Sequence, residues 1–293
     1  MALNLHHLRV FAAVADRGGF SRAAEALRLS QPAVSKSVQE LERQVGTALV
    51  ERAGRASRLT EAGVALAARA RELFSVEAAA EEELRTLRGM EGGTLRVGAS
   101  TTIATYMLSP ILARFGAEHP AVTLRVVSAN TRDIARRLLE RRLDVALVEG
   151  PVSHARIECQ PWRTDALVVI VAPDSPLARR RAVDPATIAA ERMIVRERGS
   201  GTREVAERAF AARGLTLSVA LQLGSTEAVK QAVAAGLGAA IVSRTAAEDQ
   251  LALGRLVVVP LRGLSLEREL SELQLVGRSA SPAARAFTAL LRE

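Results

Sequence analysis

The chain has little cysteine and no long apolar run, and each shortage excludes a class of protein. One cysteine, Cys159, in 293 residues excludes an internal disulfide framework and is typical of a reducing compartment. The longest apolar run, residues 232–242, is far shorter than the ~20 residues that cross a bilayer. Arg9, Asp16 and Arg17 interrupt the segment that would form the apolar core of a signal peptide. We therefore expect a cytoplasmic protein without membrane contact.

Residues suited to catalysis or metal binding are also scarce. The four histidines, His6, His7, His119 and His154, include no pair at the i, i+4 spacing of a helical zinc site. The segment RERGSGTRE, residues 196–204, lacks the G-x-x-x-x-G-K-[ST] pattern of a phosphate-binding loop, and GLGAA lacks the third glycine of a dinucleotide fingerprint. We expect no catalytic residues, no metal and no cofactor.

Positive charge, in contrast, is plentiful and unevenly distributed. The formal net charge is +8 and the pI is about 11.0. The first 60 residues hold nine Lys and Arg residues against five acidic ones, so half of the surplus lies in a fifth of the chain. Such a surplus favours a polyanionic partner. The N-terminal segment is therefore where we first expect contacts with nucleic acid.

Apolar residues in the first 45 positions fall at helical spacing in three short blocks, which predicts three packed amphipathic helices. Gly18 and Gly19 separate the first two helices, and residues 28–30 form a tight turn before the third. Ser30 is a good N-cap, and Pro32 is tolerated in the first turn because its missing N–H would be unpaired there. A helix, a three-residue turn and a helix form the helix-turn-helix pattern, whose second helix enters the major groove of DNA.

The polar face of the third helix has the chemistry of base readout, because glutamine pairs bidentately with adenine and lysine donates to guanine. This face carries Gln31, Ser35, Lys36 and Gln39. A solvated polar face on an ordinary core helix is the alternative interpretation. Farther along, Arg52, Arg55 and Arg58 lie in a stretch with Gly and Ser that is suited to a wing, whose arginines would contact phosphate.

A long helix is predicted from Thr60, a suitable N-cap, to about Arg88, because no proline interrupts this alanine-rich segment. A helix of ~28 residues is roughly 42 Å long, too long to be covered by so small a domain. Its apolar stripe therefore favours pairing with a second helix, and a lone solvated helix is the alternative. We divide the chain into a DNA-binding domain at 1–60, a linker helix at 61–90 and an effector-binding domain at 91–293.

From Thr94 onward, strands and helices alternate in two series, which predicts two α/β lobes with parallel-rich sheets. The first lobe comprises about 91–163 and 268–293, and the second about 164–267. The chain crosses between the lobes twice, near 164–171 and near 259–270. Two lobes joined by a double crossover leave a cleft, and ligands of such sheets lie beyond the carboxyl ends of the strands.

Three strands of this region are each followed by hydroxyl residues at a predicted helix start, where free N–H groups favour an anion. Each start taken alone is more often only an N-cap. Arg196, Arg198 and Arg203 add positive charge, and which of the three faces the cleft stays open because arginines alternate between the faces of a strand. Glu149 ends a strand at the mouth of the same cleft. From this pattern we predict an effector site made of Ser100, Thr101, Thr102, Glu149, Arg198, Ser200, Gly201, Thr202, Ser225 and Thr226.

The segment FAAVADRGGFSRAAEALRLSQPAVSKSVQELERQVGTALVERAGRASRLTEAG resembles the winged helix-turn-helix of LysR-type transcriptional regulators almost end to end. The resemblance implies an N-terminal all-α winged helix-turn-helix, a long linker helix and a two-lobed, periplasmic-binding-protein-like α/β effector domain. It also implies which residues meet DNA. Arg52 and Arg55 approach the backbone, and five residues face operator bases: Gln31, Pro32, Ser35, Lys36 and Gln39. Lys36 replaces the arginine usual in the family, and so keeps the charge without the bidentate fork.

Four cleft segments, GASTTI, VEGP, RERGSGTRE and LGSTEAVKQAV, resemble the branch of this family tied to sulfur assimilation and to sulfite or sulfate metabolism. This implies a small, sulfite- or sulfate-like anion as effector. Since a similar LGS-EAVKQAV segment occurs in the branch governing carbon fixation, a small organic or phosphorylated metabolite is the alternative. The family further implies three partners: a double-stranded DNA operator, a second copy paired through the linker helix in a dimer or tetramer, and RNA polymerase. A solute-binding protein would share the two lobes, but it has no use for residues 1–60.

Overall fold

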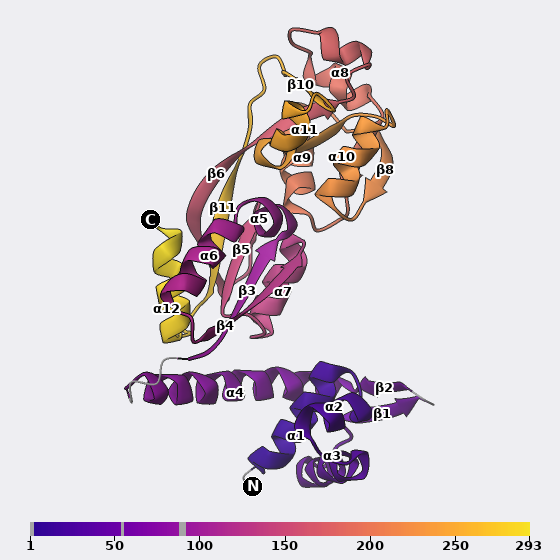
Figure 1. Ribbon diagram of the computed structural model, residues 1–293. Helices are drawn as coiled ribbons and strands as arrows, with labels where there is room; N and C mark the ends of the chain where they lie inside the picture. Colours follow the sequence, from indigo (N-terminus) through magenta and orange to yellow (C-terminus); the bar gives the residue numbers. More distant parts are fainter. Residues whose placement is uncertain (1–2, 54–55, 88–91) are drawn as a thin grey trace. The chain divides into compact units, whose positions relative to one another are not determined.

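The computed structural model describes residues 3–53, 56–87 and 92–293. The chain divides into two compact units, Met1–Leu84 and Arg85–Glu293. Figure 1 shows the course of the chain within each unit. No helix within the described residues is both long enough and apolar enough to cross a membrane.

Three short helices form the core of the first unit: α1 (Leu5–Arg17), α2 (Phe20–Leu27) and α3 (Gln31–Val45). Gly18 ends α1 in the left-handed conformation, with φ 68°. The Ser30 hydroxyl caps α3 by accepting a hydrogen bond from Ala33 N at 3.3 Å. Apolar side chains from all three helices pack together around the buried Phe11. The predicted helix-turn-helix is therefore present in the structure.

A two-stranded wing follows, made of antiparallel β1 (Val50–Ala53) and β2 (Ala56–Leu59). The Glu42 side chain on α3 fixes its base, because its Oε1 accepts hydrogen bonds from Leu49 N at 2.8 Å and Val50 N at 3.1 Å. The long helix α4 (Glu61–Leu87) begins where Thr60 Oγ1 accepts from Gly63 N at 2.9 Å. The capping residue expected from the sequence thus starts this helix.

The first lobe of the second unit contains four strands and three helices before the chain crosses over. In chain order they are β3 (Gly93–Ser100), α5 (Thr101–Tyr106), α6 (Ser109–Glu118), β4 (Val122–Ala129), α7 (Thr131–Leu139), β5 (Val145–Glu149) and β6 (Ile157–Val171). The first helical stretch of this lobe is divided into two helices, α5 and α6. The helix breaks at Met107 and Leu108 and restarts with Pro110 in the first turn of α6, where proline is favoured.

The second lobe follows β6, and the chain then returns to the first. Its elements are η1 (Pro176–Arg179), α8 (Pro185–Ala190), β7 (Met193–Arg196), α9 (Gly201–Ala211), β8 (Val219–Leu223), α10 (Thr226–Ala234), β9 (Ala240–Ser243), α11 (Arg244–Ala252) and β10 (Val257–Val259). The returning elements are β11 (Leu266–Leu275) and α12 (Pro282–Leu291). Helices α8 and α11 were not predicted from the sequence.

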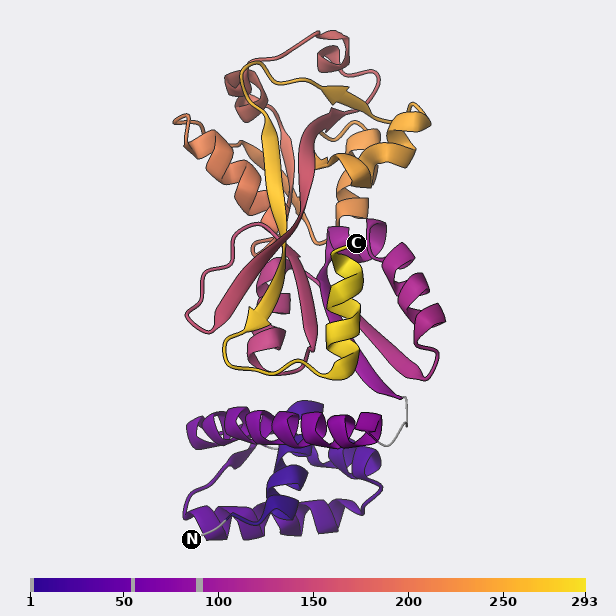
Figure 2. The ribbon, with the colours of Figure 1, turned by 90° about the vertical axis from the view of Figure 1, so that its left-hand side faces the viewer.

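Two long antiparallel strands, β6 and β11, run through both lobes and join them, as Figures 1 and 2 show. The main sheet has the order β10-β6-β11-β5-β3-β4, with β9 also paired to β6, and β7 pairs with β8 separately. The expectation of one separate sheet in each lobe was therefore wrong. The crossover segments are strand residues of a shared sheet, so residues on them lie between the lobes.

The strand β5 shows how the first lobe is layered. Val145 and Leu147 pack in one buried cluster with α5, α6 and α12, whereas Ala146 and Val148 pack in another cluster with α7. Successive side chains of a strand point to opposite faces, so β5 is covered on both sides. Figure 1 shows the same arrangement, with α6 and α12 on one side of the strands and α7 on the other. This packing leaves the carboxyl end of β5, at Glu149, facing the second lobe.

Candidate functional site

The polar face of α3 is turned away from the core of the first unit. Val34, Val38 and Leu41 are buried against α1 and α2. On the opposite side the structure brings together the five residues expected to face bases: Gln31, Pro32, Lys36 and Gln39, which are exposed, and Ser35, which is half-buried. The helix therefore offers hydrogen-bonding and cationic groups on an accessible surface.

The wing contributes one arginine that can be placed. Arg58 lies on β2 and is exposed. Arg52 belongs to β1 by its backbone, while its side chain and the whole of Arg55 lie outside the described residues. Their predicted contacts with the DNA backbone stay predictions.

In the second unit, hydroxyl groups from both lobes converge on one carboxylate, that of Glu149. Ser100 Oγ donates to Glu149 Oε2 at 2.7 Å, and the Thr102 and Thr202 hydroxyls donate to Oε1 at 3.2 and 3.1 Å. Glu149 is only 2% exposed, and its three partners are buried with it. We expected Glu149 at the mouth of the cleft, but it lies inside. The hydroxyls predicted to surround an effector surround this side chain.

A buried arginine completes this cluster. Arg268 Nη1, on β11, donates to Thr202 Oγ1 at 2.7 Å and lies 3.4 Å from Glu149 Oε1. Its Nε and Nη2 lie 2.8 and 2.6 Å from Asp165 Oδ2 on β6, and Ser243 Oγ donates to the other oxygen of Asp165 at 2.9 Å. One guanidinium thus stands between two buried carboxylates. We call Ser100, Thr102, Glu149, Asp165, Thr202 and Arg268 the interlobe cluster.

Sequence reasoning missed Arg268 and Asp165. The two residues are partners in the register of β6 and β11. Asp165, a charged residue at the start of the apolar run 166–172, was a signal that could have drawn attention to the first segment, whereas Arg268 is flanked by Glu267 and Glu269 and gave no such signal. Their pairing could not be foreseen, because the register of strands far apart in the sequence is set by the tertiary fold.

Arg196 is the arginine of RERGSGTRE that reaches across the lobes. Its side chain is 3% exposed, and Nη1 donates to Thr226 Oγ1 at 2.7 Å while Nη2 lies 3.4 Å from Thr101 Oγ1 in the first lobe. Its Nε and Nη2 also donate to the two carboxylate oxygens of Glu197 at 2.8 and 3.0 Å. Glu197 is 23% exposed, so this acid closes the solvent side of the guanidinium.

The other two arginines lie elsewhere, and the choice of Arg198 as a cleft residue needs correction. Arg198 is exposed, because it follows the end of β7 and is outside the buried cluster. Arg203 is turned along α9, where Nη1 donates to Gln222 Oε1 at 2.7 Å and Nε pairs with Glu207. All four residues of β7 are buried, so alternation along the strand could not distinguish Arg196 from its neighbours.

The start of α9 lies against the end of β5 in the other lobe. A Cβ built on Gly201 would lie 1.8 Å from the backbone oxygen of Glu149, so only glycine fits there. The neighbouring Ser200 is 2% exposed, and its Oγ has no hydrogen-bond partner within the described part of the chain. A buried hydroxyl without a partner costs free energy unless another group completes it.

At the start of α10, the two predicted hydroxyl residues have different roles. Ser225 Oγ accepts from Ala228 N at 3.1 Å and is an ordinary N-cap, the less specific of the two interpretations. Thr226 is buried and receives the hydrogen bond from Arg196. Of this pair, only Thr226 is tied to the charged groups between the lobes.

A further contact between the lobes lies beside α10. Tyr106 Oη donates to Glu227 Oε2 at 2.7 Å, and Lys230 Nζ lies 2.9 Å from the same carboxylate and 4.9 Å from the Tyr106 ring centroid. Burial and the hydrogen bond to Glu227 raise the pKa of Tyr106 above its ordinary value. The tyrosine therefore stays a protonated donor, which holds α5 against α10.

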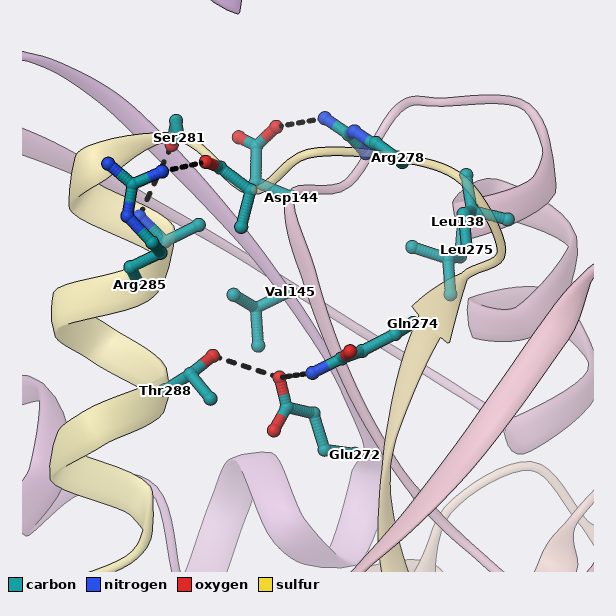
Figure 3. Close-up of a pocket in the computed structure, with 12 residues that line it drawn as sticks. Leu138, Asp144, Val145, Glu272, Gln274, Leu275, Arg278, Ser281, Arg285 and Thr288 are labelled. Carbon is teal, nitrogen blue, oxygen red and sulfur yellow. Dashed lines mark hydrogen bonds and ion pairs between the residues drawn. The ribbon is translucent and has the colours of Figure 1, made fainter. Parts of the chain in front are cut away.

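A separate cavity of about 190 Å³ lies in the first lobe, between β11, α12 and the start of β5 (Figure 3). Its acidic groups are paired within its own lining. Asp144 meets Arg278 at 2.8 Å, and Glu272 accepts hydrogen bonds from Thr288 at 2.9 Å and Gln274 at 3.1 Å. Asp144 precedes β5 whereas Glu149 ends it, so this cavity lies at the opposite end of the strand from the interlobe cluster. Within the described ranges, no group of three His, Cys, Asp or Glu side chains is placed to hold a metal ion.

Each of the two units matches a known protein family. The family model for the bacterial regulatory helix-turn-helix protein, lysR family, matches residues 5–64, and the model for the LysR substrate binding domain matches residues 88–293. The RuBisCO operon transcriptional regulator of Allochromatium vinosum is 38% identical over 98% of this chain and 95% of its own. The uncharacterized HTH-type transcriptional regulator YeiE of Escherichia coli K12 is also 38% identical, over 89% and 88%.

The two-lobed unit also resembles a protein domain of known structure. The regulatory domain of CcmR from Synechocystis PCC6803, in complex with 2-PG, is 28% identical with a TM-score of 0.64. The match covers 68% of this chain and 96% of that domain.

Proposed function

Because the chain belongs to the lysR family of bacterial helix-turn-helix regulators, we propose how its two units divide the work of a ligand-responsive transcriptional regulator. The first unit reads a pseudo-palindromic operator through the exposed face of α3. The second binds a small anion between its lobes and thereby changes the geometry of the bound DNA. The protein acts in the cytoplasm without a catalytic step, and RNA polymerase is a further partner.

The proposed dimer forms through α4. Leu73, Val76 and Leu84 are large apolar side chains on this helix that stay 41%, 65% and 57% exposed within one chain. They fall on one side of the helix at 100° per residue. A second copy of α4 lying along this side would cover them, and a pair of such dimers would form the tetramer.

The chemistry between the lobes is the observation that carries the anion proposal. Hydroxyl groups from both lobes and a buried guanidinium already hold a carboxylate there, the side chain of Glu149. Beside it, Arg196 links Thr101 and Thr226, and only the partly exposed Glu197 closes its outer side. We propose that the effector displaces the Glu197 carboxylate from Arg196 and completes the unpartnered hydroxyl of Ser200.

The chemical class of the effector follows from these hydroxyl and guanidinium groups between the lobes. A sulfite- or sulfate-like oxyanion is our first candidate, and a small organic or phosphorylated acid is the second. The complex of the related CcmR domain with 2-PG favours the second. Thermal-shift screening with sulfite, sulfate, thiosulfate, phosphate, 2-PG and small carboxylates decides between them, because a bound ligand raises stability with the logarithm of its excess over Kd.

The anion site is tested by a matched pair of variants, Arg196→Gln and Arg198→Gln, which remove the same charge two residues apart. We expect Arg196→Gln to lose the melting-temperature shift produced by the effector while specific operator binding is retained. Arg198→Gln should keep both, because Arg198 lies at the surface. Equal loss of the shift in both variants would show that the anion is held by the general positive field and not by Arg196.

The DNA face is tested by Gln31→Ala and Lys36→Ala in quantitative gel shifts. Each should weaken binding to the operator by ~1–3 kcal/mol and relax sequence choice, since each removes a contact with base edges. Arg43→Ala is the control, because Arg43 lies on the same helix and forms an ion pair with Glu40. The same loss of affinity on random DNA would contradict a role in base readout.

A further inference from the structure

We infer that Glu149 is a tethered ligand of the interlobe cleft, a carboxylate of the chain itself that fills an anion subsite and thereby decides which effectors fit. The inference deepens the proposed function and rests on it for the consequence about effectors. The subsite itself can be tested without any effector.

The contacts of Glu149 are those that proteins give to bound anions. Both carboxylate oxygens accept hydrogen bonds from hydroxyls, Oε2 from Ser100 and Oε1 from Thr102 and Thr202, and Arg268 Nη1 lies 3.4 Å from Oε1. The donors come from four elements, β3 and α5 in one lobe, α9 in the other and β11 between them. Hydroxyls and a guanidinium converging in this way are oriented for a negative group, and here that group belongs to the chain.

The charges within the cluster set a limit on what can join it. Glu149 and Asp165 carry two negative charges against the single positive charge of Arg268, so the buried cluster has a net charge of −1. The side chains of all three are at most 2% exposed, so solvent screens them weakly. A dianion bound at the same donors would make the net charge −3, which burial strongly disfavours. The native chain therefore excludes a dianionic group from this subsite.

A consequence for the effector follows. Its negative group binds at Arg196, and the part that faces Glu149 is neutral or carries a hydrogen-bond donor. Removing the Glu149 carboxylate brings Asp165 and Arg268 to zero net charge and leaves three hydroxyl donors around an empty volume. A free monoanion entering that volume restores the original charge of −1.

The experiment uses acetate as the probe, because Glu149→Ala removes a CH₂–COO⁻ fragment that acetate supplies as its methyl and carboxylate groups. In the full chain, Glu149→Ala should melt below the wild type and regain stability with acetate. The expected rise is saturable and about 3 °C when acetate exceeds its Kd tenfold. Chloride at equal ionic strength controls for the effect of salt.

Two further proteins make the test specific. Glu149→Gln fills the same volume without charge, so it should respond to acetate no more than the wild type does, and both should respond less than Glu149→Ala. Glu267→Ala removes an exposed acid on β11 and controls for unspecific binding of acetate. Should Glu149→Ala prove insoluble, Glu149→Ser takes its place with the same expectation, and recovery of soluble protein only when acetate is present also supports the inference.

Three outcomes overturn the inference: no acetate response in either shortened variant, an equal response in Glu149→Gln, or an equal response in the wild type. These outcomes are distinct from failure of the proposed function, which is decided by the effector screen and by Arg196→Gln. If the wild type responds to an effector while Glu149→Ala does not respond to acetate, the proposed function as a regulator stands and the inference about Glu149 is wrong.

Discussion

Gly201→Ala is expected to separate the two lobes of the effector domain, because the substitution places a methyl group where a backbone oxygen already lies. The added Cβ would be 1.8 Å from Glu149 O, 2.6 Å from Glu149 C and 2.9 Å from Glu149 Cγ. Ordinary contact begins at 3.4 Å, so α9 and the end of β5 would have to move apart by about 1.6 Å, the difference between 3.4 and 1.8 Å. Two of the three atoms are backbone, so no rotation of the Glu149 side chain can relieve the clash.

The free-energy cost of this movement depends on the contacts that it stretches. Forcing extra volume into a packed site typically costs ~1–3 kcal/mol. We expect the upper end, because the hydrogen bond from Thr202 to Glu149 and the contact of Arg196 with Thr101 cross the same gap. For a unit of this size, ~3 kcal/mol corresponds to a fall in melting temperature of roughly 6–12 °C. The effector response should be lost with it, while operator binding through α3 should be retained.

Gly116→Ala is the matched control, since it makes the same chemical change in α6 with nothing within 4 Å of the added Cβ. Alanine is favoured over glycine inside a helix by ~0.5–1 kcal/mol, so this variant should melt slightly above the wild type. Differential scanning calorimetry on the two variants therefore tests for shifts of opposite sign. A Gly201→Ala protein with wild-type melting temperature and effector response would refute the close approach of the lobes.

Three further perturbations have definite expected results. Gly63→Ala should destabilise the DNA-binding unit by ~1–3 kcal/mol and weaken operator binding, as measured by urea unfolding and gel shift, because its Cβ would lie 2.0 Å from Leu49 O at the base of the wing. Arg268→Met should cost ~3–5 kcal/mol in urea unfolding, since it leaves two buried carboxylates without their cation; a loss below ~1 kcal/mol would contradict the buried pairing. Burial, with Glu269 nearby, raises the pKa of the Cys159 thiol, so its alkylation should be slower at neutral pH than that of free glutathione and should accelerate as pH rises. A faster rate than glutathione at neutral pH would contradict that environment.

The elements that local sequence determines were predicted well. The turn at Gly18, the cap at Ser30 and the start of the long helix at Thr60 each depend on one residue and its next few neighbours. The sheet could not be predicted in the same way. Whether 164–171 and 259–270 are short crossovers or parts of two long paired strands depends on contacts between segments a hundred residues apart, and no local pattern records them.

The candidate cleft shows the same limit at the level of side chains. The hydroxyls at Ser100, Thr102 and Thr202 were identified from strand ends, where topology places them together. Their partner could not be identified, because the hydrogen-bonding chemistry of a free anion and of a carboxylate on the chain is the same. Alternation could not decide which of Arg196 and Arg198 points inward, because residues two apart share a face of a strand and Arg198 lies beyond the end of β7.

The placement of Asp165 and Arg268 on the two crossover strands gives the cluster a mechanical consequence. These strands are the covalent link between the lobes, and both residues lie in the segments that must bend if the lobes rotate. A change of charge at Glu149 alters the contacts of Thr202, which is hydrogen-bonded to Glu149 and to Arg268 at once. The free energy of ligand binding can therefore act on the strands that set the angle between the lobes, since a ligand shifts an equilibrium only through contacts that differ between the two states.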